Sequence, residues 1–354
     1  MELTQTERHQ VRFSGKTSEF FGIWIVNLAL SIITLGIYSA WAKVRTNRYF
    51  YSHTQVDGHR FRYLAQPLQI LIGRLIAATL FVGYVVSANF IPATMPVFLI
   101  VFFLVMPWLV NQSVRFGLRM TSYRNIRFSF KGSYGQALVY FGILPIIAAF
   151  TFGLAYPWVF KRMDEYIHAN ISYAKQPLEP ELRSSQYYWT AMVVIASVVF
   201  VSLIYLAVSL LVMPSMAAVM GDPDPANMGL GAIVFMGLSV SWYLIVFFVA
   251  AGVYKARIRN HIYNNSRMDP LAKFESQVPV AGYAFLLATN ALAIIASIGL
   301  AYPWTKIRKA RYLATYTAVY ISSSIVDLVD EQAQSESALA EEAAGFFDFE
   351  VGVG

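Results

Sequence analysis

Cysteine is absent from the 354-residue chain, which excludes disulfides, thiolate metal ligands and a cysteine nucleophile. The five histidines form no HExxH motif or other paired ligand spacing, and neither a Walker motif nor G-x-S-x-G occurs. These absences leave no candidate catalytic, cofactor-binding or metal-binding residue. We therefore expect a protein that is not an enzyme and carries no cofactor.

Charge is also scarce. Only 13% of the residues are charged and 57% are hydrophobic, whereas soluble domains carry about 25% charged residues. Several runs reach the roughly 20 apolar residues that a membrane span requires. This composition predicts an all-α, polytopic membrane protein with about seven hydrophobic helices. The expected segments lie at about 20–42, 68–88, 94–113, 134–157, 188–213, 229–252 and 280–303.

One short pattern occurs three times and organises the chain. The letters GLAYPW at 153–158 return at 299–304, and the looser copy GIYSAW occupies 36–41. In each copy an Arg follows the Trp by four residues and a Tyr follows the Arg by four more. The nine residues are Trp41, Arg45, Tyr49, Trp158, Arg162, Tyr166, Trp304, Arg308 and Tyr312. A hydroxyl lies two residues before each Gly, at Thr34, Thr151 and Ser297.

These copies predict a threefold repeated unit, made of a membrane helix, a break at Gly and a second, interfacial helix. Gly permits the left-handed conformation that ends a helix, and the Pro after it in two copies suits the first turn of the next. Spacings of four place the Trp, Arg and Tyr on one helix face. Such a face can contact lipid phosphate or another anion, or it can be an ordinary interfacial anchor.

Three polar residues inside apolar segments are candidate functional residues at membrane depth. Asn27 and Asn290 lie nine residues before Gly36 and Gly299, where the middle copy has Leu144. Buried amides cost free energy unless they are bonded, so these two either pair between helices or line a polar path. Arg74 is the third such residue, and it either serves a function or extends to the membrane interface.

The order of the segments defines the expected domains. A polar arm at 1–18 precedes a membrane domain at 19–324, and an acidic tail expected to be disordered occupies 325–354. Within the membrane domain, repeat copies at about 20–49, 134–166 and 280–312 alternate with helix pairs at about 68–113 and 188–252. A strand-like snippet, Arg12-Phe13-Ser14-Gly15, has relatives ahead of three other apolar segments.

Positive charge predicts orientation, because Lys and Arg concentrate in cytoplasmic loops. The connections 89–93 and 214–228 contain neither residue, whereas 43–67, 114–133, 158–187 and 253–279 are all basic. Seven ordinary crossings would export some of these basic loops. If each repeat copy enters and leaves on the same face, all of them stay cytoplasmic. Both arrangements remain open from the sequence.

A family resemblance rests on Phe20–Leu28, Thr34–Arg45 and Asp57–Phe61. These stretches resemble the YjgN-like family of bacterial inner-membrane proteins, a domain of unknown function. The two later copies fit that family's repeated Thr-Leu-Gly-x-Tyr-x-x-Trp unit, although both shift the Tyr by one place and only the middle one keeps the Thr. The resemblance covers about 12–324. It implies a multi-pass location in the bacterial inner membrane and brings no substrate or catalytic residue.

Two functions are therefore expected from different classes. Repeats, broken helices and amides at membrane depth are typical of transporters, which favours movement of a small solute or ion. The alternative is a structural or regulatory membrane protein that organises lipids or partners through its basic cytoplasmic face. The expected partners are membrane lipids with anionic headgroups. Basic charge beside membrane segments indicates cytoplasmic loops more than nucleic-acid binding.

Overall fold

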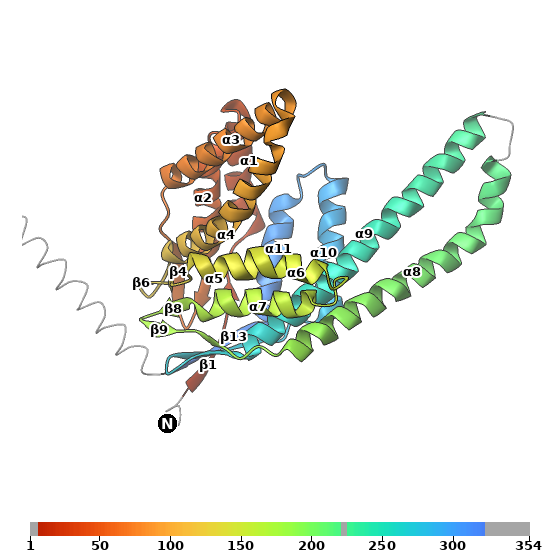
Figure 1. Cartoon of the computed structure of the whole chain (residues 1–354). Coiled ribbons are helices and arrows are strands. Elements are labelled where there is room, and N and C mark those ends of the chain that lie inside the picture. The colour runs from red at the N-terminus through yellow and green to blue at the C-terminus, as the bar shows by residue number, and fades with distance from the viewer. Residues whose placement is uncertain (1–5, 221–224, 323–354) are drawn as a thin grey trace, which may run out of the picture.

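Two long helix hairpins dominate the computed structural model, which describes residues 6–220 and 225–322. The first joins α3 (Pro67–Phe90) to α4 (Met95–Arg119), and the second joins α8 (Ser184–Met220) to α9 (Pro225–Asn264). The second projects far from the strands (Figure 1). Four segments in these hairpins are long and apolar enough to cross a membrane, and few of their residues are buried in the protein. They are Pro67–Phe90, Met95–Arg119, Ser184–Leu211 and Met236–Asn264.

Three shorter hairpins each pair an apolar first helix with a more polar second one. They join α1 (Thr17–Ile33) to α2 (Ser39–Ser52), and α10 (Val280–Ala296) to α11 (Tyr302–Thr315). In the middle one, α7 (Tyr156–Ala169) follows a first helix divided into α5 (Tyr134–Ala137), the π-helical η2 (Leu138–Ile143) and α6 (Leu144–Ala149). Pro145 explains the π turn, because its ring cannot accept ordinary α-helical geometry with the preceding turn. The predicted set of seven membrane helices and the threefold repeat stay predictions.

Each short hairpin reverses at the same kind of turn. In the first, Leu35 and Gly36 have φ angles of 50° and 91°, and the N–H of Gly36 donates to Ser31 O at 2.7 Å. Thr34 Oγ1 accepts from the N–H of Tyr38 at 2.9 Å and so caps the start of α2. The equivalent residues are Thr151, Phe152 and Gly153, then Ser297, Ile298 and Gly299. The bend predicted at each hydroxyl-x-Gly is confirmed.

Short antiparallel strands correct the expectation of an all-α fold. Most of them lie in the connections between the helix hairpins, and they include the strand-like snippet at Arg12–Phe13. The strands are β1 (Thr6–Gln10), β2 (Arg12–Phe13), β3 (Thr54–Val56), β4 (His59–Tyr63), β5 (Thr121–Tyr123), β6 (Ile126–Arg127), β7 (Ser129–Phe130), β8 (Ile171–Tyr173), β9 (Gln176–Pro177), β10 (Glu179–Pro180), β11 (Ser266–Met268), β12 (Ala272–Ser276) and β13 (Thr317–Ser322). Strands of two to six residues are too short to show a period-two pattern.

The strands join into a closed circuit, which we call the strand ring. Three sheets, β1-β13-β12-β11-β10, β2-β3-β4-β5-β6 and β7-β8-β9, follow one another through single residues between consecutive strands. These residues are Val11, Phe128 and Leu178, and the N–H of each donates to a carbonyl at 2.8–3.1 Å. The polar arm closes the circuit, because β1 pairs with β13 from Thr6↔Ser322 to Gln10↔Ala318. The acidic tail at 325–354 lies outside the described residues.

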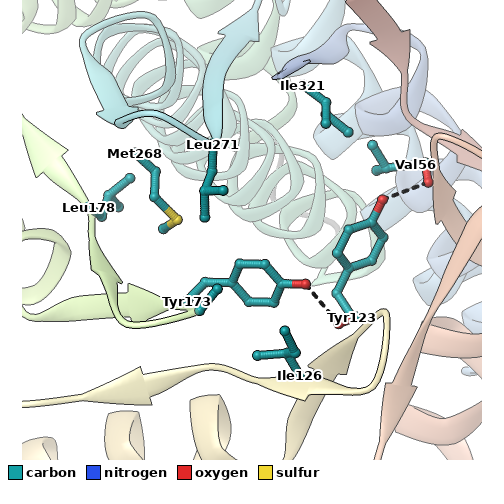
Figure 2. Packing of buried hydrophobic residues seen from close by; sticks show 9 residues of the cluster. Val56, Tyr123, Ile126, Tyr173, Leu178, Met268, Leu271 and Ile321 are labelled. Atoms are coloured by element: carbon teal, nitrogen blue, oxygen red, sulfur yellow. Dashed lines mark hydrogen bonds between the residues drawn. The ribbon is translucent and has the colours of Figure 1, made fainter. Parts of the chain in front are cut away.

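Apolar side chains fill the middle of the strand ring. Val56, Tyr123, Tyr173, Met268 and Leu271 point toward one another from separate strands and turns (Figure 2). The hydroxyl of Tyr173 donates to Tyr123 O at 2.9 Å, and that of Tyr123 donates to Val56 O at 3.0 Å. Both buried hydroxyls are thereby satisfied within the core. The strand ring is therefore closed at its centre by packed side chains.

The helix hairpins follow the same circuit. Each one packs on the next, through α2 and α3, α4 and α5, α7 and α8, and α9 and α10, and α11 returns to α1. Every hairpin begins no more than four residues after one strand and ends two residues before the next. Within the described residues, five helix hairpins thus stand on the strand ring with both ends at the same layer.

Candidate functional site

The first short hairpin brings together two of the predicted residues, Asn27 and Arg45. Asn27 lies on α1 with only 4% of its surface exposed. Arg45 Nη1, on α2, donates to Asn27 Oδ1 at 3.3 Å and to the hydroxyl of Tyr38 at 3.1 Å. The guanidinium therefore bonds the two helices of the hairpin together, and the amide does not face a second asparagine.

The third short hairpin repeats this arrangement more tightly. Arg308 Nη1 donates to Asn290 Oδ1 at 2.9 Å and to Thr289 Oγ1 at 2.7 Å. The guanidinium also lies 5.0 Å from the centroid of the Trp304 ring, within cation–π range. Asn290 Nδ2 donates to Thr305 O at 3.4 Å, so both ends of this buried amide are bonded inside the hairpin.

In the middle short hairpin the arginine has a different partner. Leu144 occupies the place of the asparagine, and Arg162 Nη1 instead donates to Glu165 Oε2 at 3.1 Å. Arg162 also lies 5.5 Å from the Trp158 ring centroid. Lys161 Nζ shares the same carboxylate at 2.6 Å. A carboxylate on the second helix thus replaces the amide on the first.

The three tyrosines do not gather into one site. Tyr49 and Tyr166 are 7% and 4% exposed, and each hydroxyl bonds to groups at the base of its hairpin. Tyr49 donates to Lys16 O at 3.0 Å, and Tyr166 donates to Ser133 O at 2.9 Å. Tyr166 also donates to Asn111 Oδ1 on α4 of the neighbouring hairpin at 2.8 Å. Tyr312 packs beside Tyr283. These positions favour packing of the helix ends over direct contact with headgroups.

The predicted residues therefore form three separate clusters, one in each short hairpin. Trp41 is half-buried, and Trp304 is 42% exposed. Arg74 on α3 is exposed and bonds Ser39 Oγ at the start of α2, so it lies next to the turn of the first short hairpin. Contact of these residues with lipid stays a prediction. In the described part of the chain, no three His, Asp or Glu side chains gather in a metal-binding cluster.

Sequence reasoning missed the exposed turns of the short hairpins. Leu35, Phe152 and Ile298 are 94%, 98% and 94% exposed, and further exposed apolar residues flank each of them. Turns in water are built from Gly, Pro, Asn, Asp and Ser, whereas these turns carry large apolar side chains. The sequence already contains this feature, because apolar residues stand on both sides of Gly36, Gly153 and Gly299. Exposed apolar clusters of this kind mark a candidate contact surface.

In the described residues, four helices are long and apolar enough to cross a membrane, and several of the segments that connect helices are basic. Together these features define a polytopic membrane protein. The chain belongs to the family described as bacterial protein of unknown function (DUF898), whose model matches residues 8–346. It is 24% identical to inner membrane protein YjgN of Salmonella typhimurium, with 93% of each chain covered. YjgN of Escherichia coli O157:H7 is 30% identical over 46% of this chain and 40% of the relative. YjgN of Escherichia coli K12 is 29% identical over 42% and 37%, respectively.

No solved structure matches the chain significantly. The relatives are named inner membrane proteins, and the described part of the chain contains four helices that can cross a bilayer. The protein is accordingly a multi-pass protein of the bacterial inner membrane, as the sequence predicted. The family resemblance drawn from Phe20–Leu28, Thr34–Arg45 and Asp57–Phe61 is confirmed.

Proposed function

We propose that this protein is a non-enzymatic lipid organiser of the inner membrane, which dips three short helix hairpins into the cytoplasmic leaflet. The observation that carries the proposal is the combination of exposed apolar turns with hairpin ends held at one layer. Leu35, Phe152 and Ile298 would insert into lipid, while the strand ring at the base would remain in the cytoplasm.

Helix length supports a re-entrant path for the short hairpins. Helix α1 has 17 residues and is about 26 Å long at 1.5 Å per residue. The hydrocarbon core of a bilayer is about 30 Å thick, so such a helix enters the membrane without leaving it on the far side. Backbone at that depth must satisfy its own hydrogen bonds, and the Thr34 and Ser297 hydroxyls do this at the turns.

The distribution of charge supports the same orientation. All four basic connections, 43–67, 114–133, 158–187 and 253–279, contain strands of the strand ring. The connection 89–93 has no Lys or Arg and joins α3 to α4 at their far ends. The positive-inside rule then assigns the strand ring to the cytoplasm. The two long hairpins would cross the membrane, and the three repeat copies would enter and leave on the same face.

The structural features support transport of a small solute or ion less than they support a role in organising lipids. A polar path would use Asn27 and Asn290, yet each of these amides bonds an arginine of its own hairpin. The centre of the strand ring is packed with apolar side chains. The features favour a role in which basic side chains and inserted apolar turns act on the surrounding lipids.

Single-cysteine labelling tests the topology, and the natural lack of cysteine makes each label specific. In intact spheroplasts, an impermeant maleimide should label Ala93→Cys at once, but His59→Cys and Lys175→Cys only after lysis. Leu35→Cys and Phe152→Cys should react slowly from either side, because lipid shields them. Labelling of Lys175→Cys from the outside would refute the same-face arrangement of the middle hairpin.

Lipid analysis tests the activity itself. The purified protein, exchanged into bilayers with equal amounts of phosphatidylglycerol and phosphatidylcholine, should retain the anionic lipid preferentially. The triple variant Arg45→Ala, Arg162→Ala and Arg308→Ala should retain less. Equal retention of both lipids by the parent protein would overturn the proposed function.

A further inference from the structure

We infer that the groove between the third and first short hairpins is a binding site for one anionic phospholipid. This inference rests on the proposed function and deepens it, because it assigns a defined site and stoichiometry to the lipid. The groove encloses about 470 Å³ and is lined by α10, α11 and the first residue of α1. It lies where the last hairpin of the circuit meets the first, next to the closure by β1 and β13.

Two arginines give the groove its charge. Arg308 and Arg311 are three residues apart on α11, so they lie on neighbouring turns of one helix face. Arg308 donates hydrogen bonds to Thr289 and Asn290, and these bonds hold its guanidinium in place before a ligand binds. Arg311 is exposed and donates to Gly15 O at a long 3.3 Å, which leaves most of its donors free. No Asp or Glu lines the groove.

The rest of the lining suits an acyl chain. Ile307 and Leu286 form an apolar floor and are 1% and 3% exposed. Phe285 and Trp304 stand at the edge of the groove and are 66% and 42% exposed. A free phosphate ion would gain nothing from these four side chains. A lipid would use them together with the cations, which is why we assign the groove to a lipid.

The direction of the groove matches the orientation of a lipid in the cytoplasmic leaflet. Thr17 and Thr315 lie at the end nearest the strand ring, at the start of α1 and the end of α11. Arg311 is one turn from that end, while Trp304 is near the start of α11 and thus nearer the hairpin turn. A phosphate beside Arg311 and the two hydroxyls would therefore place its acyl chain along Phe285 and Trp304, toward the membrane interior.

Native mass spectrometry of the full chain tests this site. The first bound phosphatidylglycerol is titrated against the parent, against Arg308→Gln/Arg311→Gln, and against the groove-filling Thr315→Phe. Each cation near an anionic surface contributes about 1 kcal/mol. Removing two should therefore weaken this first binding about thirtyfold, at 1.4 kcal/mol per tenfold change. Thr315→Phe keeps both charges and should also reduce occupancy, because it removes the space for the lipid.

The matched control is Arg60→Gln/Arg127→Gln, which removes the same charge from exposed positions in the strand ring. It should bind phosphatidylglycerol within about twofold of the parent, since general attraction falls off within a Debye length. Parent-like binding by both groove variants would overturn the site, while a persisting preference of the parent for anionic lipid would leave the proposed function standing. If the parent protein shows no preference for anionic lipid, both the groove site and the proposed function are wrong. Displacement of the lipid by equimolar inorganic phosphate would show recognition of the ion alone and would also overturn the site.

Discussion

Substitution of Gly252 tests the closest approach between two helices of the circuit. Gly252 lies on α9, and a Cβ added there would fall 2.5 Å from both Cα and Cβ of Ala284 on α10 and 3.0 Å from its nitrogen. Carbon atoms in contact are ordinarily about 3.5–4.0 Å apart. Gly252→Ala must therefore push α9 and α10 apart by on the order of 1 Å, because the nearest atoms include the backbone of Ala284 and cannot move aside as a flexible side chain would.

Two effects of opposite sign decide the result. Replacing Gly by Ala inside a helix stabilises it by roughly 0.5–1 kcal/mol. Overpacking a tight contact costs roughly 1–3 kcal/mol. We expect the second to win, with a net loss of about 1–2 kcal/mol in the free energy of unfolding. Gly237 is the matched control on the same helix, since nothing lies within 4 Å of its added Cβ. Gly237→Ala should stabilise the protein.

Thermal unfolding in detergent, followed by tryptophan fluorescence, measures both variants against the parent. The two midpoints should move in opposite directions. Adding Ala284→Gly to Gly252→Ala removes the clash between side chains but leaves the one with the Ala284 Cα, so recovery should be partial. If Gly252→Ala raises the midpoint as much as Gly237→Ala does, the close packing of α9 against α10 is wrong.

Three further predictions concern the strand ring. The Gln10 side chain donates to the carbonyls of three residues at the end of α11 and the start of β13 at 2.8–2.9 Å, so Gln10→Ala should cost roughly 1–2 kcal/mol in a thermal unfolding assay. A hydrogen bond from Arg8 lowers the pKa of Glu275, so this pair should stabilise the fold at neutral pH and lose its effect as the pH falls through that lowered pKa. Arg8→Ala should flatten the corresponding part of the curve of melting temperature against pH. Tyr173→Phe should cost roughly 1–3 kcal/mol, because the buried Tyr123 carbonyl loses its donor.

The turns were predictable from the sequence because their chemistry is local. Gly36 takes a positive φ that disfavours other residues, and Thr34 lies within reach of the N–H that it caps. Both requirements are met by residues a few positions apart, so they leave a spacing that can be counted along the chain. The pairs Asn27–Arg45 and Asn290–Arg308 are each 18 residues apart. Because the two residues of each pair lie on different helices, their contact can be recognised only once the hairpin geometry is known.

The strand ring was beyond sequence reasoning for a different reason. Its closing pair, Thr6↔Ser322, joins residues at opposite ends of the described chain. The individual strands are too short for alternation to separate them from basic loops, and their pairing depends on helix hairpins that bring their ends together. Phe61, Phe128 and Phe274 each follow a basic residue in the relatives of the strand-like snippet, and all three pack against the core of the strand ring.

The proposed topology also explains why five helix hairpins left only three visible copies of one motif. A hairpin that reverses inside lipid must satisfy its backbone with its own residues, so its turn is restricted to a hydroxyl, a residue with positive φ and a glycine. The turn between α3 and α4 would reverse in water, which can bond the free backbone groups, and its residues Ile91–Thr94 follow no such rule. A polar turn inserted at Leu35 would therefore damage membrane insertion, whereas the same change at Ala93 would be tolerated. In the proposed topology, the motif occurs three times because three turns lie in lipid. The circuit has five members because five hairpins of the described chain pack side by side.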